Sequence, residues 1–230
     1  ERYYRPLRCL GDHIEYTGSV LAIDPAGRGK DETGYAVCKM LNGYLYIPAA
    51  GGLSGGYSEE TLTTLAELAK EHQVNYIVSE SNFGDGMFNE LMRPVLNRIY
   101  PCSMEEVRHS TQKEKRIIDT LEPVMSGHRL VIDPKVVQDD YQTIQKYPHE
   151  SQLKYSLFYQ MSRLTRERGA ITHDDRLDAL SIAVNYWTEQ MAQDAEVKMS
   201  ERKSELLDIE LQNFTDAYFK NKGGGGVLTW

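Results

Sequence analysis

Apolar residues alternate along the chain between runs of strand length and stretches with helical spacing. Gly18 to Asp24 ("GSVLAID") is a short apolar run before a loop rich in Gly and Pro, which predicts a buried strand. Two alternating stretches, Thr33 to Met40 and Tyr44 to Ala49, flank Leu41-Asn42-Gly43. Asn-Gly between such stretches favours a β-hairpin. The beginning of the chain therefore predicts three strands.

Helical spacing appears after this hairpin. Residues Ser58 to His72 carry apolar positions at helical spacing, with Ser58 as N-cap. Val74 to Glu80 ("VNYIVSE") predicts another buried strand. The remaining predicted elements are a helix ending near Arg98, a strand at 105–110, a helix at 113–125 capped by Gly127, a strand or extended arm at 129–133, and helices at 134–146, 151–166 and within 170–184. Strands followed by crossover helices predict an α/β domain with a mixed sheet.

The last part of the chain differs in composition from the rest. Residues 194–222 alternate charge with sparse apolar positions, and a four-glycine run and "VLTW" follow. We expect a solvated helical extension, a flexible spacer and a small hydrophobic tip that is a candidate docking contact. The sequence therefore predicts a core at 18–193 and a tail at 194–230.

Composition excludes some classes of protein. No apolar run approaches the roughly 20 residues that span a bilayer, and Cys9, Cys38 and Cys102 form no C-x-x-C pair. These features predict a protein that works in solution inside a cell, without a thiolate zinc site. The net charge of -8 speaks mildly against a simple nucleic-acid binder. Enzymes that hold divalent metals with carboxylates are an exception, so charge alone leaves DNA binding open.

Three aspartates, Asp174, Asp175 and Asp178, open the predicted last core helix. Thr172 and Asp175 have the spacing of a capping box, and acids near a helix N-terminus favour its macrodipole. The same carboxylates on a buried helix could be metal ligands. The helix alone leaves both interpretations open.

Other acids fall where sites form in α/β sheets. Asp24 and Glu80 each end a predicted strand, and Asp175 and Asp178 are three residues apart on nearly one helix face. Asp31 could reach in as an auxiliary ligand. Asp24 before Pro is also ordinary turn chemistry, whereas an acid closing a buried strand, as Glu80 does, needs a partner. Converging carboxylates need a cation, and all-oxygen ligands suit two Mg²⁺ or Mn²⁺ ions about 3.5–4 Å apart.

Four stretches together resemble a known family. They are "LAIDPAGRGKDETGYAV", "YIVSESNFGDGMF", "KEKRIIDTLEPVMSGHRLVI" and "HDDRLDALSIAV". They are similar to the motifs of the nuclease domain of large terminase subunits, the DNA-packaging motor proteins of tailed bacteriophages, particularly short-tailed phages. The resemblance runs from about Val20 to Trp187 and implies a ribonuclease H-like fold, a mixed β-sheet flanked by helices. Holliday-junction resolvases and retroviral-type integrases share that fold.

The resemblance implies roles for individual residues. Asp24, Glu80 and Asp175 match the acidic metal-binding triad of the family, with Asp178 and Asp31 as supporting acids. The alignment leaves Asp174 as the alternative to Asp175.

Large terminases also carry an N-terminal ATPase domain that translocates DNA. The chain lacks the phosphate-loop spacing G-x-x-x-x-G-K-[ST] and begins with Glu. We therefore expect a nuclease part without ATPase activity, preceded by a linker at 1–17. By the same resemblance, the expected partners are double-stranded DNA, the ATPase domain, the portal protein and the small terminase subunit. The expected location is the host cell cytoplasm, with no membrane contact.

Basic residues cluster near the predicted acids despite the acidic total. The candidates for DNA contact are Arg28, Lys30, Lys113, Lys115, Arg116, Arg163, Arg166 and Arg168. Solvated helix faces are the alternative interpretation of the helical members. No base-reading motif accompanies them, so we expect little sequence specificity. His173 is either an exposed first-turn residue or a group that acts near the metals.

The main hypothesis is a divalent-metal-dependent endonuclease that cuts double-stranded DNA concatemers by two-metal hydrolysis during viral genome packaging. A junction resolvase on the same fold is the alternative enzyme. The alternative from another class is a non-catalytic interaction domain for a packaging or capsid partner, in which the acids are caps and ion-pair partners.

Overall fold

The structure, a computed structural model, describes residues 14–26, 31–80 and 86–222 of the chain. The chain forms two compact units, Glu1–Trp187 and Thr188–Trp230. All of the β-structure in the described residues and all of the predicted acids lie in the first unit. Arg28 and Lys30, the two basic candidates of the glycine-rich loop, lie outside the described residues.

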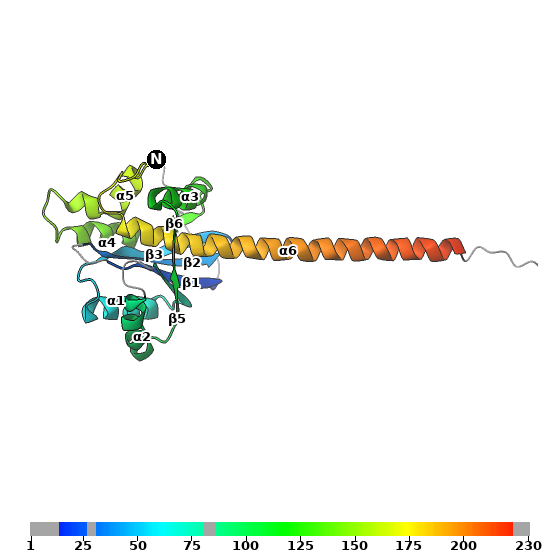
Figure 1. The fold of residues 1–230 in the computed structure, drawn as a ribbon, viewed down its shortest axis with the longest axis horizontal. Helices are drawn as coiled ribbons and strands as arrows, with labels where there is room; N and C mark the ends of the chain where they lie inside the picture. Colours follow the sequence, from blue (N-terminus) through cyan, green and yellow to red (C-terminus); the bar gives the residue numbers. More distant parts are fainter. Residues whose placement is uncertain (1–13, 27–30, 81–85, 223–230) are drawn as a thin grey trace, which may run out of the picture. The chain divides into compact units, whose positions relative to one another are not determined.

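A six-stranded mixed sheet forms the centre of the first unit (Figure 1). Its strands are β1 (Gly18–Asp24), β2 (Thr33–Leu41), β3 (Tyr44–Leu53), β4 (Tyr76–Glu80), β5 (Ser103–Val107) and β6 (Leu130–Ile132). Their order is β5-β4-β1-β2-β3-β6. β2 is antiparallel to β1 and β3, whereas the β1–β4, β4–β5 and β3–β6 pairs are parallel. The predicted mixed α/β sheet is confirmed.

The predicted hairpin joins β2 and β3. Asn42 and Gly43 both have positive φ, at 53° and 78°. Two consecutive positive φ angles match the twist of hairpin strands, and Asn-Gly adopts them at little cost. The turn brings Leu41 opposite Tyr44 and starts the register of the pair.

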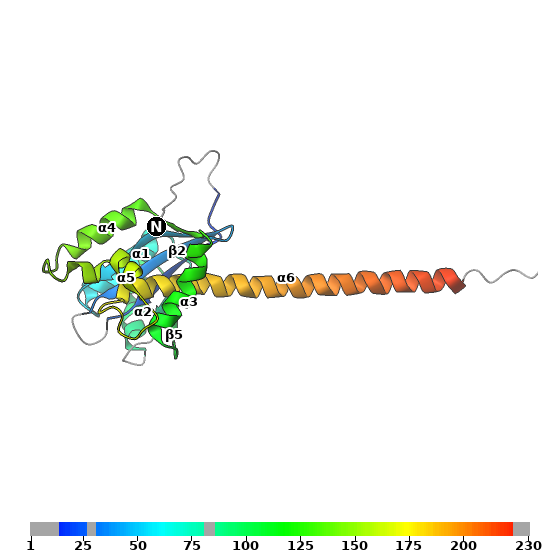
Figure 2. The same ribbon diagram turned by 90° about the horizontal axis from the view of Figure 1, so that it is seen from above.

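Helices cover both faces of the sheet. They are α1 (Glu59–Glu71), α2 (Met87–Ile99), α3 (Lys113–Ser126), α4 (Pro134–Ile144), α5 (Leu157–Arg163) and α6 (Asp175–Lys222), with a 3₁₀ turn η1 (Gln152–Tyr155). α1 and α2 lie on one side of the sheet, and α4, α5 and the beginning of α6 lie on the other (Figures 1 and 2). As expected, Ser58 caps α1 by accepting a hydrogen bond from the Thr61 amide, and Gly127 is the C-cap of α3.

The alternation of β1 assigns its residues to two cores. Leu21 and Ile23 pack in the cluster that contains Leu65 of α1 and Met92 of α2. Because successive strand residues point to opposite faces, Asp24 faces the other side, toward α6. β1 is fully buried beyond Gly18, as its apolar run predicts.

The beginning of α6 is buried on both sides. Leu177, Leu180, Ile182 and Val184 are each at most 2% exposed. Trp187 ends this buried part, and its indole Nε1 donates to the carbonyl oxygen of Cys38 at 3.1 Å. The acids in the first turn of α6 are therefore held by a rigidly packed helix.

The prediction of one helix over 151–166 is wrong. η1 and α5 are separated at Ser156, which has the extended angles φ −80° and ψ 128°. Its hydroxyl accepts from the Tyr159 amide and donates to Asp140 at 2.6 Å. Serine favours such caps over helix interiors. A tertiary contact with α4 thus fixes the break.

Two boundary expectations also need correction. The capping box of Thr172 and Asp175 is wrong, because α6 begins at Asp175 and a capping box needs the acid at the third helical position. The strand predicted at 105–110 is β5, which begins two residues earlier and ends three residues earlier, because it pairs with β4 from Tyr76 opposite Ser103 to Glu80 opposite Val107.

The second unit consists of the remainder of α6 as far as that helix is described, to Lys222. The expected helical extension is confirmed, and the glycine run and "VLTW" lie outside the described residues. In the described ranges, every helix falls short of the combined length and apolar character that a membrane crossing requires.

Candidate metal centre

Asp24 and Glu80 lie side by side at the carboxyl ends of two neighbouring strands. β1 and β4 are parallel neighbours, with Ile23 opposite Ser79, so their last residues come together. Asp24 is 2% exposed and Glu80 is 9% exposed. The adjacency expected from the sequence is confirmed.

The first turn of α6 brings a third carboxylate to this point. Asp178 is fully buried, and single carboxylate oxygens of Asp24, Glu80 and Asp178 lie within 4.8 Å of one another. Gly34 of β2, which is paired with Asp24, allows this approach. A Cβ at Gly34 would overlap the carbonyl group of Asp175 and lie 3.2 Å from the Arg176 nitrogen. We call Asp24, Glu80 and Asp178 the buried acid group.

Two cations from α3 contact the buried acid group. Lys113 Nζ lies 3.3 Å from Asp24, 3.0 Å from Asp178 and 2.9 Å from Asp174. Arg116 Nη2 lies 3.1 Å from Glu80 Oε1 and 2.9 Å from Asp178 Oδ1. These two cations offset part of the repulsion among the carboxylates. The sequence identified both as basic candidates for DNA contact, but it did not indicate that they pair with the acids.

Burial changes the protonation of these acids. The pKa of Asp24 is raised to about 7, chiefly by loss of hydration; Lys113 lowers it, and the carboxylates of Asp178 and Asp175 raise it. Burial likewise raises the pKa of Glu80 to about 8, with Asp178 and Asp24 as the next causes. Acids with such raised pKa values favour a bound cation, which replaces the lost hydration and neutralises the charge.

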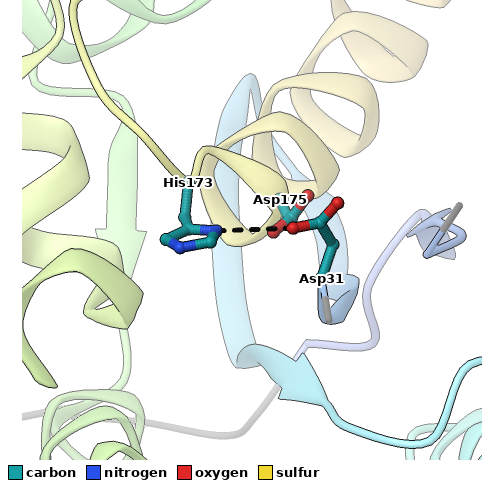
Figure 3. Close-up of side chains that lie close together, drawn as sticks. All are labelled: Asp31, His173 and Asp175. Carbon is teal, nitrogen blue, oxygen red and sulfur yellow. Dashed lines mark ion pairs between the residues drawn. The ribbon is translucent and has the colours of Figure 1, made fainter. Parts of the chain in front are cut away.

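A second group lies next to the first. Asp31, His173 and Asp175 also place one ligand atom each within 4.8 Å of one another. Figure 3 shows the imidazole of His173 beside the carboxylates of Asp31 and Asp175, with His173 Nδ1 3.6 Å from Asp31 Oδ1. Burial raises the pKa of Asp175 to about 7. We call these three residues the histidine group.

The position of His173 differs from the exposed first-turn residue considered from the sequence. It precedes α6, its side chain is 17% exposed, and its ring stacks on Tyr155 with centroids 4.2 Å apart. The interpretation as an exposed first-turn residue is wrong, because His173 precedes α6 and the aromatic contact covers its ring. The alternative, a group near the acids, agrees with its position.

The donor atoms of both groups fit divalent ions. The buried acid group offers carboxylate oxygens, which suit Mg²⁺ or Mn²⁺, and the histidine group adds an imidazole nitrogen, which Mn²⁺ also accepts. Asp175 belongs to the histidine group and also acts on the charge of Asp24. The triad implied by the family resemblance, Asp24, Glu80 and Asp175, is therefore divided between two adjoining groups.

The other basic candidates among the described residues are exposed, and one of them is paired elsewhere. Lys115, Arg163 and Arg168 are exposed. Arg166 pairs with Asp119 at 2.6 Å and with Glu122 at 3.4 Å, which fastens the segment before α6 to α3. Its DNA contact stays a prediction, as does that of the three exposed residues.

The fold and the acidic centre define a ribonuclease H-like domain, and comparison with known proteins gives its family. The family described as "Terminase Bacteriophage T7, Ribonuclease H-like domain" matches residues 23–130. The large terminase subunit of Enterobacteria phage T3 is 51% identical over 204 residues, which cover 89% of this chain. Residues 23–130 belong to the family of terminase ribonuclease H-like domains. It spans 34% of the length of the phage T3 relative.

Solved structures confirm the fold. The human cytomegalovirus terminase nuclease domain, soaked with manganese and bound to an inhibitor, matches with a TM-score of 0.52 and 14% identity, over 74% of this chain and 84% of that one. The large terminase of a thermophilic bacteriophage matches with a TM-score of 0.50 and 13% identity, over 76% of this chain and 41% of that one. At these identities the similarity establishes the architecture alone.

Proposed function

We propose that the chain is a divalent-metal-dependent endonuclease that cuts double-stranded DNA. The observation that carries this proposal is the meeting of Asp24, Glu80 and Asp178 from three separate elements in a buried position. A stable fold gains little from three buried acids, because each loses hydration and repels the others. In a family of terminase ribonuclease H-like domains, a metal centre is the function that accounts for this cost.

The buried acid group holds one ion, and the histidine group holds the second. Asp175 belongs to the histidine group and also acts on the charge of Asp24, which supports retaining it in the catalytic set together with Asp24 and Glu80. Asp178 and Asp31 complete the two groups. Bound divalent ions supply Lewis-acid activation of water and stabilise the leaving oxygen of a phosphodiester.

The basic residues of the chain offset negative charge, that of the acids and that of DNA phosphate. Lys113 and Arg116 limit the negative charge of the acids and so reduce their repulsion of DNA phosphate. The exposed cations Lys115, Arg163 and Arg168 can contact phosphates without reading bases, which agrees with low sequence specificity.

Similarity to relatives suggests the biological setting. From the 51% identity to the phage T3 large terminase subunit we infer a role in packaging viral DNA concatemers in the host cytoplasm. The inferred partners are an ATPase domain of the same polypeptide, the portal protein and the small terminase subunit. The human cytomegalovirus domain was studied with manganese, which makes Mn²⁺ the first ion to test.

Plasmid cleavage tests the proposal. The purified chain is incubated with supercoiled plasmid in Mn²⁺, Mg²⁺ or EDTA, beside Asp24→Asn. Glu59→Gln is the matched control, because Glu59 is an exposed acid paired with Arg98. We expect metal-dependent nicking and linearisation by the wild type and the control, and its loss in Asp24→Asn.

Intact plasmid under every condition, from a folded wild-type chain that binds no Mn²⁺, would contradict the proposal. That result would favour the alternative of a non-catalytic interaction domain. Mn²⁺ titration by calorimetry addresses the finer claim, with two ions expected per chain and one ion as the contrary result.

A further inference from the structure

A buried arginine follows the metal-ligand candidate Asp175. The side chain of Arg176 is fully buried and is among the largest fully buried side chains in the described part of the chain. Its Nε and Nη2 donate to the two carboxylate oxygens of Glu32 at 2.8 and 3.0 Å. Its Nη1 donates to Asp140 at 2.8 Å and to Thr143 at 3.0 Å. A buried arginine therefore joins the segment before β2, α4 and the first turn of α6.

Further hydrogen bonds extend this connection. Glu32 accepts from the Tyr147 hydroxyl at 2.6 Å and pairs with Lys146 at 3.1 Å. Asp140 accepts from the Ser156 hydroxyl and from the Leu157 amide, at 2.6 and 2.9 Å. We call Arg176, Glu32, Asp140 and Tyr147 the Arg176 network.

Each member of the histidine group is connected to this network. Asp31 precedes Glu32, and Asp175 precedes Arg176. His173 stacks on Tyr155, whose ring stacks on Tyr147 at 3.8 Å. Three ligand candidates from two distant parts of the chain are thus linked to it through an adjacent residue or through stacked rings.

Stability alone is a weak explanation of the Arg176 network. A buried ion pair loses about as much hydration energy as it gains in attraction, and well-packed apolar residues are often as stable. The surrounding fold also leaves space for this pair. A Cβ at Gly52 of β3 would overlap the Glu32 carboxylate and lie 2.9 Å from Arg176 Nε. A fixed two-point geometry is what the pair adds beyond an apolar contact.

We propose that Arg176 is a positioning residue that holds Asp31, His173 and Asp175 together for a divalent cation. This inference rests on the proposed function. Arg176 acts through its neighbours and its bond to Glu32, and the chain of Tyr147 and Tyr155 orients the His173 ring. The ligand class is a divalent cation that takes carboxylate and imidazole donors, with Mn²⁺ as the probe.

Mn²⁺ affinity, measured by calorimetry on the full chain, tests this role. Arg176→Lys keeps the charge but cannot bind Glu32 at two points. Tyr147→Phe removes one hydroxyl and keeps the ring that stacks on Tyr155. The matched control is Arg98→Gln, because Arg98 is an exposed arginine in a surface pair with Glu59.

Removal of a group that orients a metal ligand costs about 10–100-fold in affinity, so we expect a loss of that size in Arg176→Lys. Tyr147→Phe should change affinity in the same direction, and cleavage by this variant should recover at saturating Mn²⁺. Arg98→Gln should match the wild type. If Arg176→Lys does not fold, Tyr147→Phe alone decides.

Folded variants with the Mn²⁺ affinity of the wild type would overturn the positioning role. A wild-type chain that binds Mn²⁺ without cutting DNA would overturn the nuclease proposal and leave the affinities to decide on Arg176. A wild-type chain that binds no Mn²⁺ would overturn both.

Discussion

At the scale of single residues, burial of the carboxylates is the main energetic cost of the candidate site. Asp24, Glu80 and Asp175 have pKa values raised to about 7, 8 and 7, chiefly by burial. The native chain therefore holds more protons on these groups than the unfolded chain does between about pH 4 and 8. Stability falls with rising pH wherever the native state binds the extra protons.

The first prediction follows from this fall of stability with rising pH. In EDTA, the free energy of unfolding should fall from pH 5 to 8, because these acids lose their protons in the native state. Thermal unfolding at several pH values measures the fall, and Asp24→Asn should reduce it. Comparison of the two proteins cancels the opposite contribution of His72, whose pKa burial lowers. Equal pH dependence in both would contradict the assignment.

The second prediction concerns Lys113, which contacts three aspartates. Lys113→Met should lower metal-free stability by about 2 kcal/mol, less than the 3–5 kcal/mol of a fully buried pair, because Lys113 is about one-third exposed. Added Mn²⁺ should stabilise the variant more than the wild type, because the ion no longer competes with the ammonium group. Thermal unfolding with and without Mn²⁺ measures both effects.

Lys115→Met is the matched control for this experiment, since Lys115 is the exposed lysine two residues further along α3. Lys115→Met should leave the metal-free stability and the stabilisation by Mn²⁺ at their wild-type values. The same Mn²⁺ stabilisation in Lys113→Met and wild type would show that the ion and the lysine do not share ligands.

The sequence identified single candidate ligands better than the residues that pair with them. Asp24 and Glu80 could be placed because each closes an apolar run that has to be a strand. Their pairing with Lys113 and Arg116 could not, because periodicity describes local order and these contacts join distant parts of the chain. A usable signal did exist for Arg176, since a charged residue in a helix that is apolar on both sides needs a buried partner.

At the scale of elements, the contact of β2 with α6 fixes the site. Gly34 is opposite Asp24 in the β1–β2 register, and its missing side chain admits the first turn of α6. The packing of α6 and the placement of its candidate ligands thus depend on one glycine. The sequence placed Gly34 in a strand but gave no indication of what would lie above it.

The third prediction is that Gly34→Ala displaces this turn. The added methyl group should destabilise the chain by about 1–3 kcal/mol, the usual cost of an overpacked core. Mn²⁺-dependent cleavage should fall by more than stability explains, because Asp175 and Asp178 move with the turn. Denaturant unfolding and plasmid cleavage measure the two effects.

Gly43→Asn is the control, since Gly43 lies in the hairpin turn where an added Cβ contacts nothing and asparagine tolerates a φ of 78°. It should retain activity. Wild-type cleavage by Gly34→Ala would show that the first turn of α6 tolerates a shift.

Element boundaries show where local rules give way to tertiary contacts. The hairpin, α1 and α3 follow their sequence signals, because turn and cap residues act locally. The break at Ser156 depends on Asp140, a contact that apolar spacing does not reveal. The capping box of Thr172 and Asp175 was also wrong, because Asp175 is the first residue of α6 and contributes to the histidine group.

At the scale of the molecule, the order of strands decides which acids meet. The sequence predicted a mixed sheet, and the parallel pairing of β1 with β4 brings two strand-ending acids together. That pairing is a property of the whole sheet and could only be assumed from the sequence. The chain spans 34% of the phage T3 relative, so its cutting activity is proposed to operate within a longer polypeptide.

Anomalous diffraction from crystals of the chain soaked in Mn²⁺ tests the metal centre most directly. We expect one manganese peak at the buried acid group of Asp24, Glu80 and Asp178, a second at the histidine group of Asp31, His173 and Asp175, and loss of the first in Asp24→Asn. Manganese peaks elsewhere on the chain, or none at saturating Mn²⁺, would contradict a metal-dependent nuclease centre at this edge of the sheet.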